Sequence, residues 1–231
     1  MARKQYTVEP SVPTIDLVAK ACIAFRDAGN TIVSVDRDEV VDENGVVVAP
    51  KTISNKRRMC TFDAAKPITQ ADRDFAQEVI DYVGGSVTMQ ILAGKKVSDF
   101  MTSLAKVLAE ETSPSWRIGL IVYAPNVYFA GKKNEVVTDQ TMARKYTSQS
   151  LGPKGQKVAL AFTLIQKKYL STFNCYSAFG EDDKGNLVSF LTQHEELCAS
   201  GNITGKIKGS DKDKWHSNAI VTQLNYVKAP A

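Results

Sequence analysis

The residues of this chain best suited to binding a ligand are the lysines and aromatic side chains of its last third. Ammonium groups bind phosphate oxygens, and the flat faces of aromatic rings stack on unpaired bases. Their combination is typical of surfaces that hold single-stranded nucleic acid. The candidate nucleic-acid-binding residues are Lys167, Lys168, Tyr169, Tyr176, Phe190, Lys206, Lys208, Lys212, Lys214, Trp215 and Lys228.

Each member of this set has a structural alternative. Phe173, Phe179 and Phe190 fit a hydrophobic core as well as a stacking platform, and Tyr176 fits either role. Trp215 lies in a charged run, where a wholly buried indole is not expected, although it could pack against the rim of the fold. The lysines could form a solvated face, and only their proximity to the aromatic residues favours binding.

The sequence has no motif for catalysis or metal binding. The Gly84-Gly85 and Gly94-Lys95 pairs lack the spacing of a phosphate-binding loop, and there is no nucleophile elbow. His194 and His216 are isolated from each other, and the sequence has no paired His/Cys set. Acidic pairs such as Asp182-Asp183 are typical of turns, although a metal-dependent nuclease would also use carboxylates. We therefore expect a protein that is not an enzyme and that needs no cofactor or metal.

Charge and cysteine content indicate the partner and the compartment. Residues 144–231 carry twelve Lys and Arg against seven Asp and Glu, a net charge of +5, whereas residues 1–143 have a net charge of −1. A polyanion is therefore expected to bind the C-terminal part. The four cysteines are widely spaced, which favours reduced thiols. The N-terminus has no apolar signal core, so we expect a cytoplasmic protein without a membrane segment.

Residues 1–130 are expected to form a mostly helical unit of nearly neutral charge. Apolar residues recur at helical spacing after Thr14 as a possible N-cap, after Thr69 with Asp72 as a capping box, and after Ser98. Gly84-Gly85 predicts the end of the second helix.

Three further segments of this unit are expected to be shorter elements. A DENG turn between valine-rich segments predicts a small hairpin near residues 31–48. Residues 50–67 are expected to be irregular. The apolar segment 116–122 predicts a buried short helix.

The rest of the chain predicts a linker followed by a small β-domain. Residues 131–150 are polar and are expected to be a linker or a partly ordered connection. Apolar residues then alternate with polar ones over five short strands. Five strands with polar connections are typical of an oligonucleotide-binding (OB) barrel, which presents strands 2 and 3 with the first and last loops as one surface. The predicted strands are 157–165, 172–180, 186–192, 202–208 and 219–228.

The predicted fold class is therefore α+β: a helical N-terminal unit with a small hairpin (1–130), a linker (131–150) and a five-stranded OB-like β-barrel (151–231). Gly205, inside the fourth strand, predicts a bend or a close approach of backbones.

A set of residues in this part resembles a known family. They are Gly152, Gly155, Lys157, Val158, Phe179, Asp183, Gly185, Asn186, Gly205, Lys206, Ile207, Lys208, Thr222, Leu224, Val227 and Lys228. With them, the C-terminal third resembles the OB-fold module of phage-encoded single-stranded-DNA-binding and replication proteins. The resemblance implies a phage origin, a role in DNA replication or recombination, and the host cytoplasm as location.

Two functions remain open at this point. The first is a single-stranded DNA-binding protein of phage replication or recombination that binds by phosphate electrostatics and base stacking, without sequence specificity; RNA is left open. The second is a replisome or recombination assembly factor, a helicase loader or mediator, that acts mainly through protein contacts. The nearly neutral N-terminal unit has no role in the first function and favours the second. The oligomeric state is not predicted.

Overall fold

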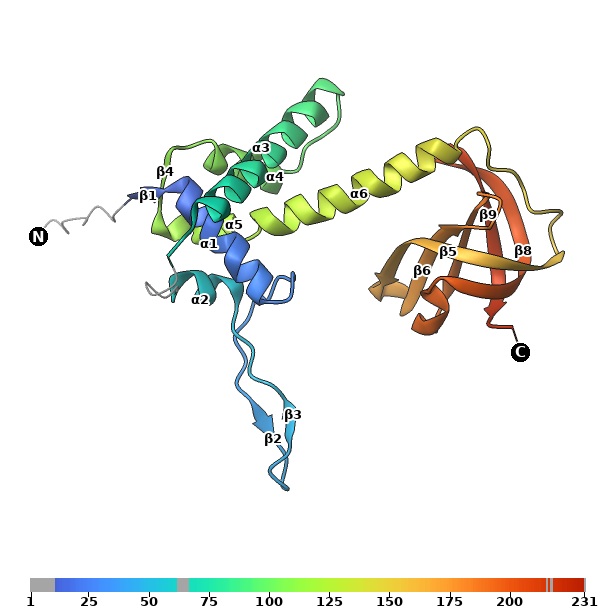
Figure 1. The fold of residues 1–231 in the computed structure, drawn as a ribbon, viewed down its shortest axis with the longest axis horizontal. Coiled ribbons are helices and arrows are strands. Elements are labelled where there is room, and N and C mark those ends of the chain that lie inside the picture. The colour runs from blue at the N-terminus through green and yellow to red at the C-terminus, as the bar shows by residue number, and fades with distance from the viewer. Residues whose placement is uncertain (1–10, 62–66, 215, 217, 231) are drawn as a thin grey trace, which may run out of the picture. The chain divides into compact units, whose positions relative to one another are not determined.

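The structure, a computed structural model, describes residues 11–61, 67–214, 216 and 218–230. The chain divides into two compact units, with the boundary between Gly131 and Lys132. Helices make up most of the first unit and strands most of the second, so the protein has the mixed α and β composition predicted (Figure 1). Helix α6 (Ala124–Arg144) begins in the first unit and ends in the second.

The N-terminal unit consists of helices around one hydrophobic core, with two short antiparallel strands. Its elements are α1 (Thr14–Asp27), α2 (Asn55–Cys60), α3 (Gln70–Leu92), α4 (Asp99–Leu108), the 3₁₀ turn η1 (Ser115–Arg117), α5 (Ile118–Ile121), β1 (Ser11–Pro13) and β4 (Thr112–Pro114). Among helices in the described ranges, none has both the length and the apolar character that crossing a membrane requires.

Apolar stripes at helical spacing form this core. Val18 of α1, Val79 and Val83 of α3, Leu104 of α4 and Ile121 of α5 are completely buried in one cluster. Burying a side chain of this size contributes about 1.5–3 kcal/mol. The stripes that predicted the helices are therefore also the residues that hold them together.

Helix α3 begins as predicted but ends later. The hydroxyl of Thr69 accepts a hydrogen bond from the amide of Asp72, whose carboxylate accepts one from the amide of Thr69, which completes the capping box. The Gly84-Gly85 pair lies inside the helix, which continues to Leu92. Two glycines cost a helix about 2 kcal/mol relative to alanine. Burial of Val87 beyond the glycines offsets part of that cost.

The segment 50–67, expected to be irregular, contains helix α2. Its N-cap is Ser54, whose hydroxyl accepts a hydrogen bond from the amide of Arg57. The side chain of Asn55 is completely buried and accepts a hydrogen bond from the amide of Val33 at 2.7 Å. Tertiary hydrogen bonds of this kind fix a helix of only six residues, which its own sequence does not predict.

Two single residues of this unit also differ from the prediction. Trp116, in the segment expected to be buried, is 68% exposed, whereas Ile121 of the same segment is completely buried. Thr14 is the first residue of α1 rather than its N-cap, and its hydroxyl forms a hydrogen bond with that of Ser113. Thr14 therefore ties α1 to β4.

A hairpin arm projects from the N-terminal unit between α1 and α2 (Figure 1). Its strands, β2 (Val40–Val41) and β3 (Val47–Ala49), flank the predicted turn, in which Asp42 accepts hydrogen bonds from the amides of Asn44 and Val46. Residues 34–51, which we call the arm, are all exposed. The predicted hairpin is thus present, and its residues are exposed on both faces.

The C-terminal unit is a five-stranded sheet that closes into a ring. Around the ring the order is β5-β6-β7-β9-β8, and β8 pairs with β5. All neighbours are antiparallel except β7 and β9, which are parallel. The elements are β5 (Lys157–Leu170), β6 (Cys175–Glu181), β7 (Leu187–Thr192), β8 (Gly201–Asp213), β9 (Ala219–Lys228) and the 3₁₀ turns η2 (Ser171–Phe173) and η3 (Glu195–Cys198).

Strands β5 and β8 are longer than predicted. Residues added at the end of β5 pair with β6, and those added at the end of β8 pair with β9. Polar residues there misled the sequence interpretation, because a strand with one solvated face needs few apolar side chains.

A second hydrophobic core fills the inside of the ring. It includes Phe162, Ala178, Val188 and Phe190, with the rings of Phe162 and Phe190 at 5.2 Å between centroids. Phe190 is only 3% exposed, so its assignment as a stacking residue was wrong. Side chains alternate along a strand, and Phe190 follows Val188 to the interior.

The segment 131–150, predicted to be a linker, is helical as far as Arg144. Val137 on this part of α6 packs against Phe179 and Leu187 on the outside of the ring. A single apolar stripe is enough to hold a helix on a sheet, and the polar residues of the segment form its solvated side.

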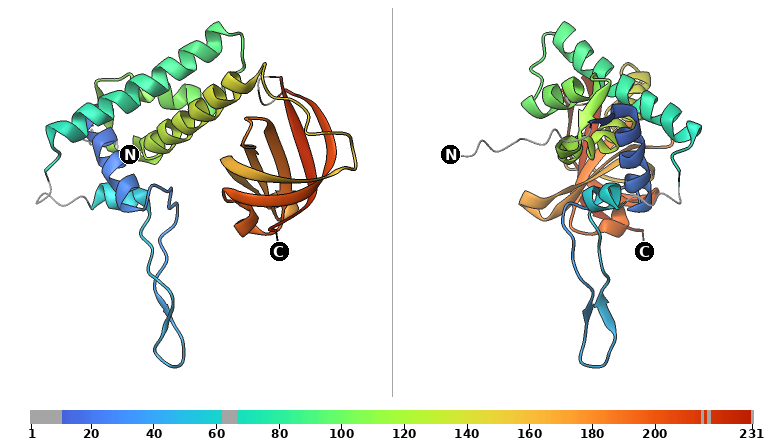
Figure 2. Two further views of the ribbon diagram at one scale, coloured as in Figure 1. Left: turned by 45° about the vertical axis from the view of Figure 1, so that its right-hand side comes forward. Right: turned by 90° about the vertical axis from the view of Figure 1, so that its left-hand side faces the viewer.

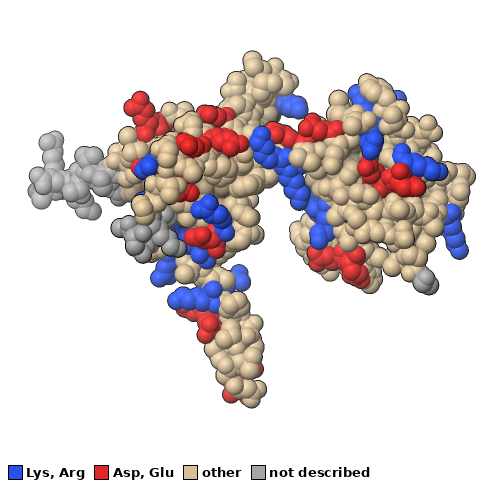
Figure 3. All heavy atoms as spheres, viewed as in Figure 1, with Lys and Arg blue, Asp and Glu red and all other residues tan. Residues whose placement is uncertain are grey.

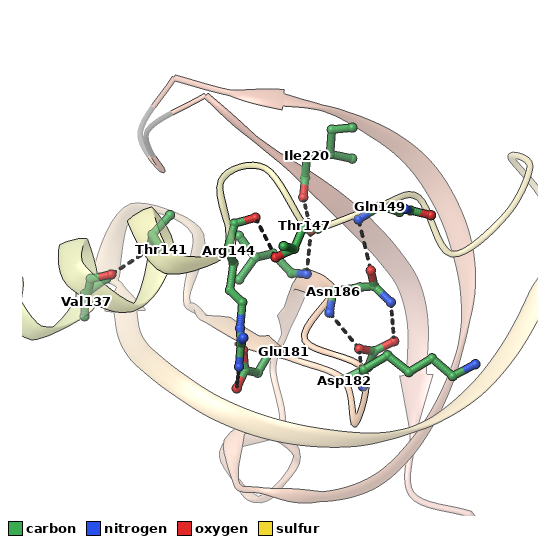
Figure 4. A network of polar contacts seen from close by, with 12 residues as sticks. Val137, Thr141, Arg144, Thr147, Gln149, Glu181, Asp182, Asn186 and Ile220 are labelled. Atoms are coloured by element: carbon green, nitrogen blue, oxygen red, sulfur yellow. Dashed lines mark hydrogen bonds and ion pairs between the residues drawn. The ribbon is translucent and has the colours of Figure 1, made fainter.

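Polar contacts then connect the end of α6 to the sheet (Figure 4). The guanidinium of Arg144 donates to both carboxylate oxygens of Glu181, at 2.8 and 3.4 Å. The hydroxyl of Ser148 donates to the carbonyl of Ile220 at 2.6 Å and accepts from the amide of Leu187 at 2.9 Å. One hydroxyl thus links β7 and β9 where they run parallel.

Replacing Ser148 with alanine tests this link. Its side chain is nearly buried, and its removal deprives two backbone groups of a partner, at a cost of about 1–3 kcal/mol. We expect faster hydrogen exchange in peptides covering β7 and β9 of the full-length Ser148→Ala protein, measured by mass spectrometry. The exposed neighbour supplies the control, Thr147→Ala, which should exchange like the wild type. Identical exchange in all three proteins would show that the link is not needed.

Candidate nucleic-acid interface

One group of predicted site residues lies on the β5–β6 hairpin. Lys167, Lys168 and Tyr169 were expected in a loop but belong to the end of β5, where Tyr169 pairs with Tyr176 of β6. The two tyrosine rings are 5.0 Å apart between centroids. We call these four residues the hairpin cluster. Lys167 lies together with the two aromatic rings, its ammonium 5.9 Å from the centre of the Tyr176 ring, whereas Lys168, the next residue of the strand, faces the opposite side of the sheet.

A carboxylate that the sequence interpretation had not considered occupies the hairpin cluster. Glu195 of η3 accepts hydrogen bonds from the ammonium of Lys167 at 2.7 Å and from the hydroxyl of Tyr176 at 3.0 Å. The bond from Lys167 is the main cause of a lowered pKa at Glu195, and the same contacts raise the pKa of Lys167 and of Tyr176. A phosphate would have to displace this negative charge to reach Lys167.

The outer face of β6 and β7, predicted as the main binding surface, is partly covered. Phe179 is 3% exposed, beneath Val137 and the ring of His216, which stacks on it at 3.8 Å. The uncovered part is a groove of about 230 Å³, the strand-face groove. Its lining residues are Ser177, Ser189, Phe190, Leu191, Lys208, Gln223, Leu224 and Asn225.

The strand-face groove offers amide, hydroxyl and leucine side chains and one cation, Lys208, but no exposed aromatic ring among its described residues. Ile207 pairs with Leu224 and Gly209 with Gln223, which leaves Lys208 between them without a register partner. Lys208 therefore occupies a β-bulge. Base stacking inside the strand-face groove is therefore not available in this arrangement.

The last loop is shorter than predicted. Lys212 lies on β8, paired with Ile220, and Lys214 lies in the following turn; both are exposed. Asp211 and Asp213 alternate with these lysines, so residues 211–214 have no net charge. Trp215 lies outside the described residues.

A second groove, of about 590 Å³, crosses β5, β8 and β9 and contains a denser set of cations. Lys157, Lys206, Lys228 and Tyr226 line it together with Val158, Ala159, Thr204 and Gly205. We call it the lysine groove. The eight described lining residues include no Asp or Glu, and these three lysines form no ion pair with a described carboxylate.

The geometry of the lysine groove follows from strand pairing. Lys157 of β5 is the register partner of Lys206 of β8, and Lys228 of β9 is the partner of Thr204, two residues away. Register partners bring side chains within about 5.5 Å at Cβ. Like charges so close repel one another, which an anion bound between them would relieve.

Tyr226 reaches the lysine groove because of a second bulge. Lys206 pairs with Asn225 and Thr204 with Lys228, so β9 has one more residue than β8 between the two pairs. Tyr226 lies in this bulge with a φ of 55°, in the left-handed region, and is 78% exposed. Opposite it, a Cβ on Gly205 would lie 3.4 Å from the carbonyl oxygen of Asn225, the close approach that the glycine predicted.

Sequence reasoning placed Lys206 and Lys228 in the site but missed Lys157 as a contact and Tyr226 altogether. Strict alternation from the buried Leu224 would turn Tyr226 to the interior, and the bulge reverses its direction. An exposed tyrosine held in a strained conformation is a reason to look for function.

In comparisons with known proteins, no family model, no curated sequence and no solved structure matches this chain. Across the described ranges, no group of three or more His, Cys, Asp or Glu side chains is placed to hold a metal ion. The candidate site therefore rests on its own geometry.

Replacing Tyr226 with glycine tests the bulge. A residue with a Cβ pays about 1–2 kcal/mol to adopt the left-handed conformation, and glycine does not. We expect Tyr226→Gly to stabilise the C-terminal unit by up to that amount, seen as slower hydrogen exchange in peptides from β8 and β9.

The matched control is Tyr169→Gly, another exposed tyrosine, which is not among the residues with positive φ. Glycine in an ordinary strand position is destabilising, so this variant should exchange faster in β5 and β6. Equal destabilisation by both substitutions would refute the strained bulge.

Proposed function

We propose that this protein binds single-stranded DNA, without sequence specificity, through the lysine groove. The observation that carries the proposal is the set of three lysines and one exposed tyrosine, with no Asp or Glu among the described residues that line the groove. Lys157, Lys206 and Lys228 bind successive phosphates, and the ring of Tyr226 stacks on a base. Neither contact reads a base edge, so binding is tolerant of sequence.

The strand order supports the further proposal that the ring is an OB-type barrel. Five strands in the order β5-β6-β7-β9-β8, with β9 inserted between β7 and β8, give a Greek-key path, as in that fold. We propose that this module serves phage DNA replication or recombination in the host cytoplasm, as the resemblance of its residues implies.

The surface offers a path along which an extended DNA strand can leave the lysine groove. Asn225 lines the strand-face groove and the next residue, Tyr226, lines the lysine groove. Lys206 and Lys208, on either side of Ile207 in β8, divide between the two grooves in the same way. A DNA strand that leaves the lysine groove over Tyr226 therefore reaches Lys208 and the side-chain amides of Gln223 and Asn225 in the strand-face groove.

The hairpin cluster has a secondary role in this proposal. Its exposed Tyr169 is held by a hydrogen bond from its hydroxyl to Asn174, and Lys168 remains outside the Glu195 contacts. Because Glu195 competes for Lys167, we assign the hairpin cluster a smaller share of the affinity than the lysine groove.

Salt dependence of binding to fluorescent oligo(dT) tests the proposal. Each phosphate contact contributes about 0.7 to the slope of log K against log salt for single strands. Neutralising one groove lysine, as in Lys206→Gln, should therefore reduce the slope by about 0.7 and weaken binding. Lys184→Gln, at an exposed lysine of the β6–β7 turn, is the control with the same charge change and should leave the slope unchanged.

Tyr226→Ala should weaken binding by about 1–3 kcal/mol, the usual contribution of one stacked base, with little change in slope. Fluorescence anisotropy in a salt series measures both effects, and duplex DNA and RNA of equal length serve as comparison ligands. No binding of oligo(dT) at low salt, or equal effects of Lys206→Gln and Lys184→Gln, would refute the proposal.

The N-terminal unit favours a second candidate function, that of a replication or recombination assembly factor. Its exposed side chains include large apolar ones, such as Val48 of the arm and Leu92 of α3. Such surfaces suit protein contacts. If the protein bound oligo(dT) no more tightly than an unrelated protein of equal net charge, this second function would be preferred.

A further inference from the structure

The arm carries an apolar surface that nothing in the described part of the N-terminal unit covers. Six of its valines are between 48% and 60% exposed: Val35, Val40, Val41, Val46, Val47 and Val48. The two strands form a narrow ribbon, and an isolated two-stranded hairpin is at best marginally stable in water. A partner that covers the valines would stabilise it.

The charge of the arm limits the kind of partner. Residues 34–51 contain five acidic side chains and two basic ones, a net charge of −3. This charge disfavours nucleic acid, and it disfavours pairing of one arm with another, because like charges repel. The arm requires a surface that is both apolar and basic.

Such a surface exists at the C-terminal end of α3. Met89, Ile91 and Leu92 are 67%, 60% and 76% exposed, and the loop that follows contains Lys95 and Lys96. The last buried residue of α3 is Val87, so the helix extends past the core of its unit. We call residues 88–98 the α3 tip.

The α3 tip has a net charge of +2, and the nearest carboxylate in sequence is Asp99, the first residue of α4. In Figure 3 the outer parts of both the arm and α3 are largely uncharged, with charged side chains at their margins. The two surfaces are therefore complementary in charge and alike in apolar character.

The arm and the α3 tip point away from each other. Figure 1 and both views of Figure 2 show the arm leaving one side of the N-terminal unit and the α3 tip leaving the opposite side. The two surfaces of one copy therefore cannot meet, but those of two copies can.

We propose that the arm of one copy docks on the α3 tip of a second copy. Val41, Val47 and Val48 of the arm then cover Ile91 and Leu92, and the acidic residues of the arm face Lys95 and Lys96. The contact joins two different surfaces, so each added copy leaves one arm and one α3 tip free, and association continues head to tail.

This self-association goes beyond the proposed function and does not depend on it. If both are correct, neighbouring copies on one DNA strand contact one another, which makes binding cooperative. The association itself requires only residues of the N-terminal unit and occurs without DNA.

Analytical ultracentrifugation of the full-length protein, without DNA, tests the proposal. We expect the average mass to rise with protein concentration and to fall when salt is added. In the arm variant, Val41→Thr with Val47→Thr and Val48→Thr, β-branched residues are kept but the apolar surface is reduced. In the tip variant, Ile91→Gln with Leu92→Gln, good helix formers are kept on the exposed end of α3.

Each variant alone should remain monomeric, and an equimolar mixture should form a dimer with one copy of each. The mixture restores one contact, between the intact arm of the tip variant and the intact α3 tip of the arm variant. Only a contact between two different surfaces, the arm and the α3 tip, gives a dimer in the mixture and monomers in each variant by itself. Leu191→Gln, at a 59% exposed leucine of the C-terminal unit, is the control and should associate like the wild type.

Three results would overturn the proposal. The wild type could stay monomeric up to its solubility limit; the tip variant could associate alone, which would mean arm-to-arm pairing; or the arm variant could associate alone, which would mean that the α3 tips pair. The Lys206→Gln protein separates this test from that of DNA binding, because it should associate like the wild type.

Discussion

Strand β9 determines the form of the C-terminal unit, because it pairs along both of its edges. It runs parallel to β7 and antiparallel to β8, and without these two pairings the sheet would remain open. Ser148 connects the backbones of β7 and β9 at this seam. The candidate site depends on the second of these pairings, because β8 lies between β9 and β5 and places Tyr226 and Lys228 in one groove with Lys206 and Lys157. Strand β9 therefore contributes both to the closure of the ring and to the candidate site.

Two local features, the packing on Phe179 and the bulge at Tyr226, determine which part of the ring is open to a ligand. The second half of α6 and the ring of His216 cover Phe179 on the outer face of β6 and β7, so that face keeps only a small polar groove. On the other side, the bulge in β9 turns an aromatic ring outward between lysines. A single-strand binder built on this frame uses its first, fourth and fifth strands more than its second and third.

How far the sequence predicted this arrangement depends on the kind of signal. The DENG turn predicted the hairpin, whose valines are exposed. Apolar periodicity correctly predicted three helices of the N-terminal unit and five strands, because burial of apolar side chains is what holds these elements in place. It failed where local preference and tertiary packing disagree: at Gly84-Gly85 inside α3, and at α2. It also failed for the segment 131–144, which is polar yet helical. The bulge at Tyr226 cannot be predicted from an alternating pattern of apolar residues. The contact of Glu195 with Lys167 cannot be predicted either, because the two residues are 28 positions apart and only the folded chain brings them together.

The central claim is that a single strand of DNA lies in the lysine groove with a base on Tyr226. Photo-crosslinking of oligo(dT) to the full-length protein, followed by mass spectrometry of the linked peptides, tests it most directly. We predict that the main crosslink maps to Tyr226 on the peptide that contains β9. Crosslinks confined to the hairpin cluster or to the N-terminal unit, with none on β9, would contradict the claim.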